Sequence, residues 1–369
     1  MIAAEHGARL ESLREGMRAR EWEAVYLASP ANFRYLAGVP ITPLERLAAL
    51  VIPRDRDPFL VVPALEAESA SANPAGMTVL SWTDAEGPFR VLRTALEQAQ
   101  VKSVALEKEA VNVKVFETLQ TILDRGSFPD ASPLVAELRI RKSPAEVAAI
   151  EEAAAVLDAC LAELPEGLRP GRSEAEIAFE LDGLVRRHGG EGTAFDTSVL
   201  SGPNAALPHG RPGPRELQEG DLVIVDFGTV RDGYCADVAR TFAVGEPSEE
   251  VREIFELVRR AQNAGCEAVR AGALCSEVDA AARSVIDNGG YGDYFVHRTG
   301  HGLGLDVHEP PSLVAGNDRP LEVGNVVTVE PGIYVPGVVG VRIEDDVAVT
   351  EGGFKRLTKA ARELIVCPA

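Results

Sequence analysis

The chain has 369 residues, which is more than twice the ~150 residues of a typical domain, so its length predicts two domains. Hydrophobic residues make up 46% of the chain and charged residues 25%, which is typical of globular proteins and excludes a disordered or fibrous chain. There are 37 Lys and Arg residues against 57 Asp and Glu residues. The resulting net charge of −20 opposes general binding to nucleic acid or to an anionic membrane.

The sequence also bears on the cellular compartment. No apolar run approaches the ~20 residues that span a bilayer, and residues 1–20 lack the apolar segment of a signal peptide. The five cysteines form no C-x-x-C pair, which opposes a disulfide framework or a zinc–thiolate site. We therefore expect a cytoplasmic protein in which the cysteines are small buried residues.

The first third of the chain alternates helix and strand patterns. A helical spacing is followed by short apolar strands, predicted at Ala24–Ala28, Ala48–Ile52, Phe59–Val62 and Ser103–Leu106. This order predicts a small α/β domain over residues 1–135. The domain has neither a phosphate-binding glycine pattern nor a cluster of metal ligands, so we expect it to serve as a lid, a dimer surface or both.

Residues 136–369 are predicted to form an α+β domain. Ser143 and Ser173 each begin a capping box that starts a helix. The segment Leu222–Thr241 is typical of a hairpin that turns at Asp232-Gly233.

The same order of elements then occurs a second time. Ser248 and Ser276 are predicted to cap two further helices, and a second hairpin is predicted over Val326–Val349. Two helices and a hairpin, occurring twice, predict two similar halves that face each other.

The first hairpin carries two acidic residues that we expect on one face. A two-residue turn places Asp237 opposite Gly228, and Asp226 is then diagonal to Asp237 on the same face. An unpaired buried carboxylate is costly, and Gly228 leaves room for an ion beside both. The pair therefore predicts a cation site, with a solvated hairpin face as the alternative.

The second hairpin repeats this arrangement with Glu330 and Glu344, whose midpoint Gly337 lies in the predicted turn. Arg342 lies two residues before Glu344 and therefore shares its face. Asp345 and Asp346 follow, and we expect both to be solvated. A salt-bridged surface hairpin is the alternative interpretation.

Histidines supply the third part of the pattern. Of only six in the chain, His297, His301 and His308 lie close together in a glycine-rich segment. The glycines oppose a helical zinc site and instead allow the backbone to approach a ligand closely.

Together these segments offer four carboxylates and an imidazole. Like charges 4 Å apart repel by ~4 kcal/mol at an effective dielectric near 20, and two divalent cations would balance four negative charges. Oxygen ligands with one imidazole suit Mn²⁺, Co²⁺ or Zn²⁺. Two such ions ~3.5–4 Å apart can hold a bridging hydroxide and polarise a carbonyl, which predicts hydrolysis.

The order Asp, Asp, His, Glu, Glu and its surrounding segments resemble the metallopeptidases of the methionine aminopeptidase, aminopeptidase P and prolidase family. The segments that carry the resemblance are VDFG, GYCADVART, HRTGHGLGLDVHE, TVEPGIY and VRIEDD. The resemblance is strong from Leu138 onward, and the N-terminal domain is similar to the creatinase-like domain of prolidases and aminopeptidases P. It implies a pita-bread fold, in which two related halves surround a dinuclear metal centre, and a homodimer.

Carried over onto this sequence, the resemblance implies five metal ligands. Asp226 would bind one ion in bidentate fashion, and Asp237 and Glu344 would bridge both ions. His301 and Glu330 would complete the second ion's ligands, and Glu330 would also be the general base for the bridging water.

The resemblance also implies catalytic and substrate-binding residues. His308 would stabilise the tetrahedral intermediate, and His209 would be a second catalytic histidine in the cleft. His297, Tyr334 and Arg342 would bind a proline-containing substrate. The implied activity is hydrolysis of the Xaa-Pro bond of short peptides by a metal-bridging hydroxide, with Mn²⁺ preferred over Zn²⁺ or Co²⁺.

Two activities stay open within this branch. A dipeptidase, which we favour, must recognise a free C-terminal carboxylate, and a guanidinium suits this task. Arg46, on an N-terminal loop, and Arg298 are the candidates, and a pairing of Arg46 with Glu45 or solvent is the plainer reading. An Xaa-Pro aminopeptidase acting on longer peptides is the alternative.

Other members of the family fit less well. Methionine aminopeptidases are usually shorter and lack the N-terminal domain, and the creatine hydrolases do not use this metal set. A non-catalytic binding module of the same fold is the remote alternative, because the ligand set here is complete.

Overall fold

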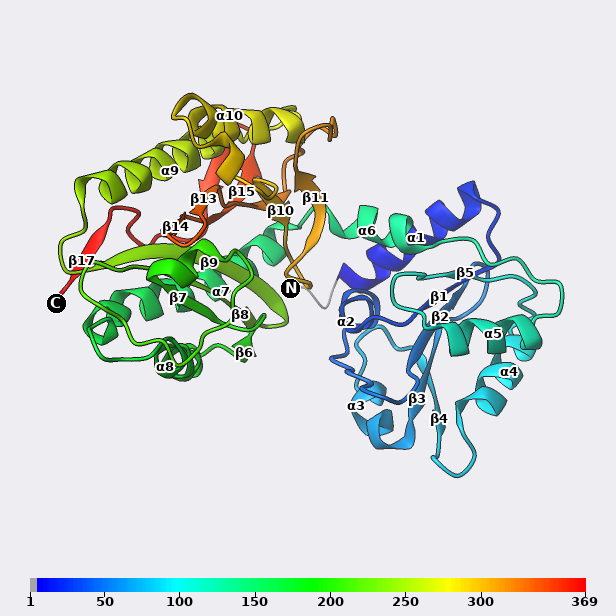
Figure 1. Ribbon diagram of the computed structural model, residues 1–369. Helices are drawn as coiled ribbons and strands as arrows, with labels where there is room; N and C mark the ends of the chain where they lie inside the picture. The colour runs from blue at the N-terminus through cyan, green and yellow to red at the C-terminus, as the bar shows by residue number, and fades with distance from the viewer. Residues whose placement is uncertain (1–4) are drawn as a thin grey trace. The chain divides into compact units, whose positions relative to one another are not determined.

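The computed structural model describes residues 5–369 and divides the chain after Arg139 into two compact units (Figure 1). Within the described residues, all five cysteines are free and buried. No helix among residues 5–369 is long and apolar enough to cross a membrane.

The first unit is built on a five-stranded mixed sheet in the order β4-β3-β2-β1-β5 (Figure 1). The strands are β1 (Ala24–Leu27), β2 (Ala49–Pro53), β3 (Phe59–Pro63), β4 (Thr78–Trp82) and β5 (Ala105–Leu106). The predicted apolar strands are confirmed, with ends that shift by one or two residues. Their runs of buried side chains are typical of a sheet covered on both faces.

Helices surround this sheet. They are α1 (His6–Ala19), α2 (Pro30–Ala37), α3 (Ala67–Ser71), which follows the short helix η2 (Ala64–Glu66), α4 (Pro88–Gln98), α5 (Val113–Ile122) and α6 (Ser132–Arg139). Leu92 and Leu96 of α4 and Leu119 of α5 pack with strand residues Tyr26 and Val51 in one apolar cluster. The first unit therefore has its own core, as the α/β pattern predicts.

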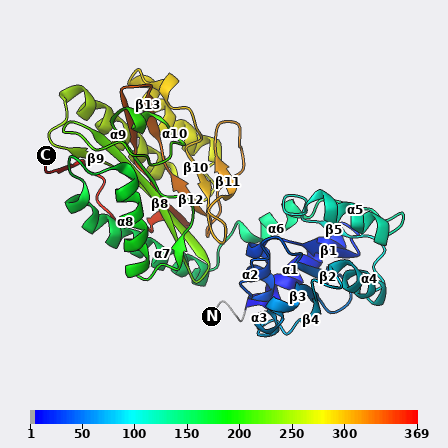
Figure 2. The ribbon, with the colours of Figure 1, turned by 60° about the horizontal axis from the view of Figure 1, so that its bottom comes forward.

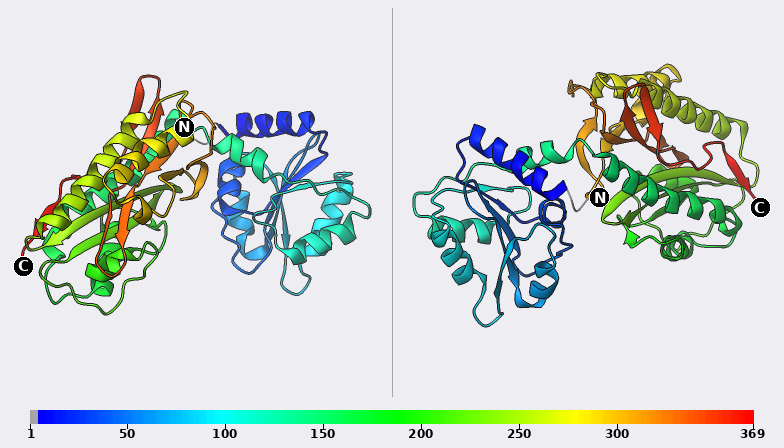
Figure 3. Two further views of the ribbon diagram at one scale, coloured as in Figure 1. Left: turned by 45° about the horizontal axis from the view of Figure 1, so that its top comes forward. Right: turned by 180° about the vertical axis from the view of Figure 1, so that it is seen from behind.

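The second unit places strands between two pairs of helices, as Figure 2 shows. The helices are α7 (Pro144–Glu163), α8 (Glu174–Arg187), α9 (Glu249–Ala268) and α10 (Cys275–Asn288), with short helices η3 (Leu164–Gly167), η4 (Gly202–Ala206) and η5 (Gly292–Tyr294). Helix α7 packs on β8 and β9, and α9 packs beside α10 (Figure 3). The order of two helices and a hairpin, occurring twice, is confirmed.

The helix starts follow the sequence in three of four cases. Capping boxes form at Ser143 and Ser173, and the Ser248 side chain accepts from the third residue of α9. The cap predicted at Ser276 is wrong, since α10 begins at Cys275 after Leu274. The Glu277 carboxylate accepts the backbone N–H of Leu274 at 3.0 Å, so the helix starts two residues earlier than a serine cap would place it.

The strands of the second unit form three sheets. The first has the order β17-β9-β8-β6, with β7 also on β8; the second has the order β11-β10-β12-β15-β16; the third is β13-β14. The first contains β6 (Gly192–Thr193), β7 (Ser198–Ser201), β8 (Leu222–Arg231), β9 (Tyr234–Val244) and β17 (Ile365–Cys367). The others contain β10 (Gly300–Gly302), β11 (Glu309–Leu313), β12 (Val326–Val329), β13 (Gly332–Val335), β14 (Val339–Arg342), β15 (Asp345–Thr350) and β16 (Gly353–Arg356).

The second predicted hairpin is divided between two of these sheets. Strand β12 pairs with β15, while β13 pairs with β14, and both pairs keep the register that opposes residues 330 and 344. Pro331 stands at the break, where it has no backbone N–H to continue the ladder. Glu330 and Glu344 therefore sit where the chain leaves one sheet for the other.

Candidate metal centre

One pocket of the second unit brings together the acidic residues and histidines singled out in the sequence. Its volume is about 540 Å³. The predicted residues that line it are Asp226, Asp237, His301, Glu330, Glu344, His209, His297, His308, Arg298 and Arg342.

Asp226 and Asp237 reach this pocket from neighbouring strands of one hairpin. The predicted register is confirmed: Gly228 lies opposite Asp237 in the pairing of β8 with β9. A Cβ at Gly228 would lie 2.6 Å from the Phe195 ring and 2.7 Å from the carbonyl oxygen of Ala236. The expectation that Gly228 leaves room for an ion is therefore wrong, because the glycine makes room for the Phe195 ring.

Glu330 and Glu344 reach the pocket from the sheet break. The backbone N–H of Glu330 donates to the carbonyl of Thr299 at 2.8 Å, and that of Glu344 donates to Ala239 of β9 at 3.0 Å. These bonds tie the two glutamates to the strands that carry His301 and Asp237.

His301 lies on β10 and is oriented by its own backbone. Its Nδ1 donates to the carbonyl of Gly302 at 3.0 Å, which leaves Nε2 with a free lone pair. That Nε2 lies 3.3 Å from Glu330 Oε1 and 3.8 Å from Asp237 Oδ2. Burial lowers the pKa of His301 to about 3, so a neutral imidazole with a free lone pair faces the carboxyl oxygens. A divalent cation would let the carboxylates stay ionised beside this lone pair.

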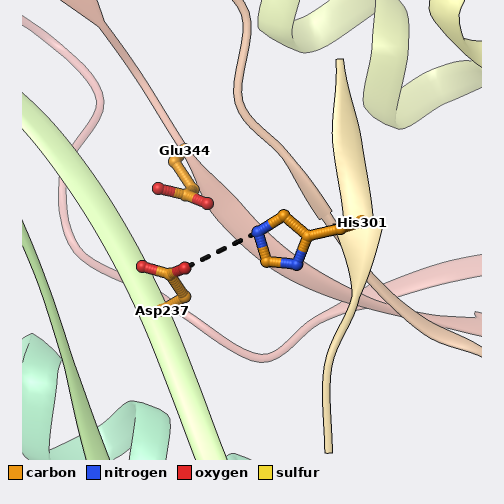
Figure 4. A group of neighbouring side chains, drawn as sticks. All are labelled: Asp237, His301 and Glu344. Carbon is orange, nitrogen blue, oxygen red and sulfur yellow. Dashed lines mark ion pairs between the residues drawn. The ribbon is translucent and has the colours of Figure 1, made fainter. Parts of the chain in front are cut away.

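The carboxylates show the same need for a cation. Asp237, His301 and Glu344 each offer an atom within 4.8 Å of the other two, and Figure 4 shows their side chains pointing toward one another. Burial raises the pKa of Asp237 and Glu344 well above the usual range and that of Glu330 to about 7. One oxygen each of Asp237 and Glu344 has no hydrogen-bond partner among the described residues. The set therefore fits divalent cations, which take oxygen and imidazole ligands.

A chain of hydrogen bonds joins Arg342 and His297, which line the pocket, through the buried Tyr334, which is not among the lining residues. The Nη1 of Arg342 bonds to Asp226, its Nε donates to the Tyr334 hydroxyl at 2.6 Å, and its Nη2 donates to the carbonyl of Pro208 at 3.2 Å. The Tyr334 hydroxyl in turn lies 2.9 Å from Nε2 of His297. Burial lowers the pKa of His297 to about 3, and the Nδ1 of the neutral ring donates to the carbonyl of Arg298 at 2.7 Å, so Nε2 accepts the bond from Tyr334.

The other two histidines of the pocket are exposed. The His308 ring meets the His301 ring edge-on, with centroids 4.4 Å apart. His209 lies on the segment that follows η4. Both can therefore meet a substrate that enters the pocket.

Arg46 lies in the first unit. Its guanidinium binds Asp84 through two bonds of 3.0 Å and Glu45 through one of 2.6 Å. The pairing with Glu45 was the plainer reading of the sequence, and the pairing with Asp84 was not predicted. A role of Arg46 toward substrate stays a prediction.

The expectation that Asp345 and Asp346 are solvated is wrong, since both are fully buried. Asp346 accepts the backbone N–H of Asp237 at 2.9 Å. Asp345 binds Arg240 at 2.7 Å and Gln262 of α9 at 2.9 Å. Alternation placed Asp345 on the face away from the pocket, but α9 covers that face, which strand periodicity alone does not reveal.

Sequence reasoning also missed several residues of the pocket. Phe195, Asp196, Ser198 and Arg211 line it from segments between α8 and β8. These residues belong to no motif, and the only signal was their nearness to the Pro208-His209-Gly210 segment.

Comparisons with known proteins agree with this geometry. A model of metallopeptidase family M24 matches residues 148–351, and a model of the creatinase/prolidase N-terminal domain matches residues 9–141. An Xaa-Pro dipeptidase of Lactobacillus helveticus is 37% identical over 97% of this chain and 99% of its own length.

Two solved structures extend the comparison. A recombinant prolidase from Thermococcus sibiricus has a TM-score of 0.93 and 38% identity, covering 98% of this chain and 99% of that one. An X-Pro aminopeptidase from Thermotoga maritima has a TM-score of 0.88 and 32% identity, covering 97% of this chain and 99% of that one.

Proposed function

The chain belongs to metallopeptidase family M24, and from this premise we propose that it is an Xaa-Pro dipeptidase that uses two divalent metal ions. The proposed ligands are Asp226, Asp237, His301, Glu330 and Glu344. Mn²⁺ is the proposed metal, with Zn²⁺ and Co²⁺ as alternatives, because the donors are four carboxylates and one imidazole.

One observation carries this proposal. Four carboxyl groups and a neutral imidazole, from strands β8, β9 and β10 and from the break between two sheets, line one pocket. Burial there disfavours the charged forms of Asp237, Glu330 and Glu344. No single segment of the sequence could hold this set, so the fold brings it together. Similarity to prolidases over nearly the whole chain supports Xaa-Pro peptides as the substrates.

The residues divide the chemistry among them. Bound divalent ions would supply a water-derived nucleophile at neutral pH and polarise the scissile carbonyl. Glu330, which lines the pocket with the other proposed ligands, would accept the proton of the attacking water. His308 would donate a hydrogen bond to the oxygen that gains negative charge.

Side chains at the pocket wall would orient the substrate. Arg342, Tyr334 and His297 form a bonded row, so Tyr334 would act mainly by fixing the other two. Arg298 also lines the pocket and would bind the free carboxylate of a dipeptide. Arg46 is the second candidate for that carboxylate.

An Xaa-Pro aminopeptidase is the alternative function. The similarity to the Thermotoga maritima enzyme over 97% of the chain supports it, since both activities use the same fold. A non-catalytic binding module is disfavoured because all five proposed ligands line the pocket.

Cleavage of Ala-Pro and Ala-Pro-Ala, measured in parallel on chelated protein with and without Mn²⁺, tests the proposal. We expect Mn²⁺ to restore cleavage of Ala-Pro and to leave the tripeptide nearly intact. Preferred cleavage of the tripeptide would establish the aminopeptidase instead. No cleavage of either peptide, with Mn²⁺ bound, would overturn the Xaa-Pro assignment.

Two variants then locate the carboxylate contact. Arg298→Ala is expected to raise the KM for Ala-Pro by about tenfold, the effect of losing one charge-assisted contact. Arg46→Ala is the comparison, and an equal or larger rise in that variant would move the contact to Arg46.

A further inference from the structure

The segment between β7 and β8 supplies much of one pocket wall. Pro208, His209, Gly210 and Arg211 of this segment line the pocket. His209 is exposed, and Leu207 is 54% exposed. Ala205 and Ala206 before them are buried, so the exposed part of this wall is held by the residues on either side of it.

A single buried carboxylate holds both ends. Glu174, the first residue of α8, is fully buried. Its Oε1 accepts the backbone N–H and the hydroxyl of Ser201, both at 2.8 Å, and the Asn204 amide at 3.1 Å. Its Oε2 accepts the Asn204 amide at 3.2 Å and the backbone N–H of Gly213 at 3.2 Å. Residues 201–213, which we call the histidine segment, are therefore closed into a loop at Glu174.

Further bonds around Glu174 strengthen this closure. Its backbone N–H donates to the carbonyl of Arg215 at 3.0 Å. The Arg215 guanidinium donates to the Ser201 hydroxyl at 2.5 Å and binds Asp221 at 2.6 Å. Helix α8 also packs beside β7 (Figure 1), so the carboxylate sits on a fixed support.

The histidine segment in turn contacts the residues of the candidate centre. The carbonyl of Pro208 accepts from Arg342, whose Nη1 bonds to Asp226. The backbone of Ala205 lies very close to Gly340 of β14. A Cβ added at Gly340 would come within 1.7 Å of the Ala205 carbonyl oxygen. A shift of the segment would therefore move His209 and remove a partner of Arg342.

We propose that Glu174 is a positioning residue, which holds the histidine segment so that His209 and the Pro208 carbonyl face the proposed metal centre. This inference rests on the proposed function, since it assigns Glu174 an effect on that reaction. Glu174 makes no contact with the ligands and acts through the five hydrogen bonds that close the loop.

The substitution Glu174→Gln tests the proposal with little change in volume. In either orientation, the glutamine NH₂ would face backbone or amide donors, so part of the loop closure is lost. We expect kcat for Ala-Pro to fall by about tenfold, because small misplacements of a catalytic group carry large costs. KM and bound Mn²⁺ should change little.

A double-mutant cycle with His209→Ala separates positioning from a general structural effect. We expect His209→Ala to lower kcat by about a hundredfold. Adding Glu174→Gln to it should lower kcat by less than about threefold more, because the group that Glu174 positions is gone. A full further tenfold loss in the double variant would overturn the proposal.

The matched control is Glu176→Gln, two residues along the same helix. Glu176 is exposed and accepts bonds from Ser173 within its own capping box, at 2.9 and 3.0 Å. It should keep the wild-type kcat. A loss equal to that of Glu174→Gln would show that α8 stability, and not the closure of the segment, limits the rate.

Amide hydrogen exchange gives a readout that does not depend on activity. Residues 201–213 should exchange faster in Glu174→Gln than in wild type, with the protein folded and Mn²⁺ retained. Unchanged exchange would contradict the proposal even if wild type cleaves no Xaa-Pro peptide, so the two failures are distinguishable. If Glu174→Gln does not fold, Asn204→Ala removes two of the five bonds and should act in the same direction.

Discussion

Glu330 combines two properties at the scale of a single residue. It lies 3.3 Å from the Nε2 of His301 among the proposed ligands, and it lines the pocket that would hold the attacking water. Glu330→Gln should lower kcat for Ala-Pro by about a thousandfold, within the usual range for a general base. Kinetics with saturating Mn²⁺ would check this, with the exposed Glu351→Gln as control. A loss below tenfold would exclude Glu330 as the base.

His308 has a different proposed role in the same pocket, which is to stabilise the oxyanion. Its ring stacks edge-on against that of His301, but it is not one of the proposed ligands. His308→Ala should lower kcat by about a hundredfold through loss of a donor to the developing oxyanion, while Mn²⁺ stoichiometry stays as in wild type. Metal analysis beside kinetics separates the two effects, and loss of bound Mn²⁺ would make His308 a ligand.

Residue identities in the candidate centre were largely accessible from the sequence. The two-residue turn at Asp232-Gly233 fixes the register that places Asp226 and Asp237 on one face, as the structure has it. The burial of Asp345 was not accessible, because it depends on α9 covering the outer face of the sheet. Which of the pocket residues bind metal or substrate stays a prediction.

At the scale of elements, the close approach of β14 to η4 is the least tolerant contact around the pocket. A Cβ at Gly340 would overlap the carbonyl of Ala205, so Gly340→Ala should lower the free energy of unfolding by about 2–3 kcal/mol. It should also lower kcat, since the histidine segment is displaced. Denaturant unfolding would measure the first effect. Gly352→Ala, where the added Cβ meets nothing within 4 Å, should stay within about 1 kcal/mol of wild type.

The elements themselves show where sequence reasoning stops. Capping boxes and apolar runs depend on neighbouring residues, so α7, α8 and the first-unit strands were placed correctly. The division of the second hairpin was missed, although Pro331 marks the break. Its cause is tertiary, since the backbone of Glu330 bonds to Thr299, just before β10, and that of Glu344 bonds to Ala239 of β9.

At the scale of the whole molecule, the predicted family and fold are confirmed by the matches over both units. The cytoplasmic location and the homodimer stay predictions. Sedimentation velocity of the purified chain would test the dimer, and a single species of monomer mass would contradict it.

Stability should depend on pH and metal together. In the metal-free chain, burial raises the pKa of Glu330 from 4.5 to about 7. Its protonated form therefore stabilises the fold at pH values below 4.5, and this contribution is lost as the pH rises through about 7. The raised pKa values of Asp237 and Glu344 act in the same direction. Metal needs the deprotonated carboxylates, so its stabilising effect grows with pH.

We therefore expect the Tm difference between Mn²⁺-loaded and chelated protein to widen by at least about 5 °C between about pH 5 and about pH 8. Differential scanning calorimetry in matched buffers would show this. A Tm difference that is constant or shrinks with rising pH would contradict the assignment of these buried carboxylates as ligands.

The dinuclear metal centre is tested most directly by a Mn²⁺ titration of the chelated protein in which bound metal and Ala-Pro hydrolysis are followed in the same samples. We expect no hydrolysis without metal, and its restoration as about two equivalents of Mn²⁺ bind per chain. Asp237→Asn should weaken both metal binding and hydrolysis. Full hydrolysis in the chelated protein, or its restoration without bound Mn²⁺, would rule out a metal-dependent reaction at this site.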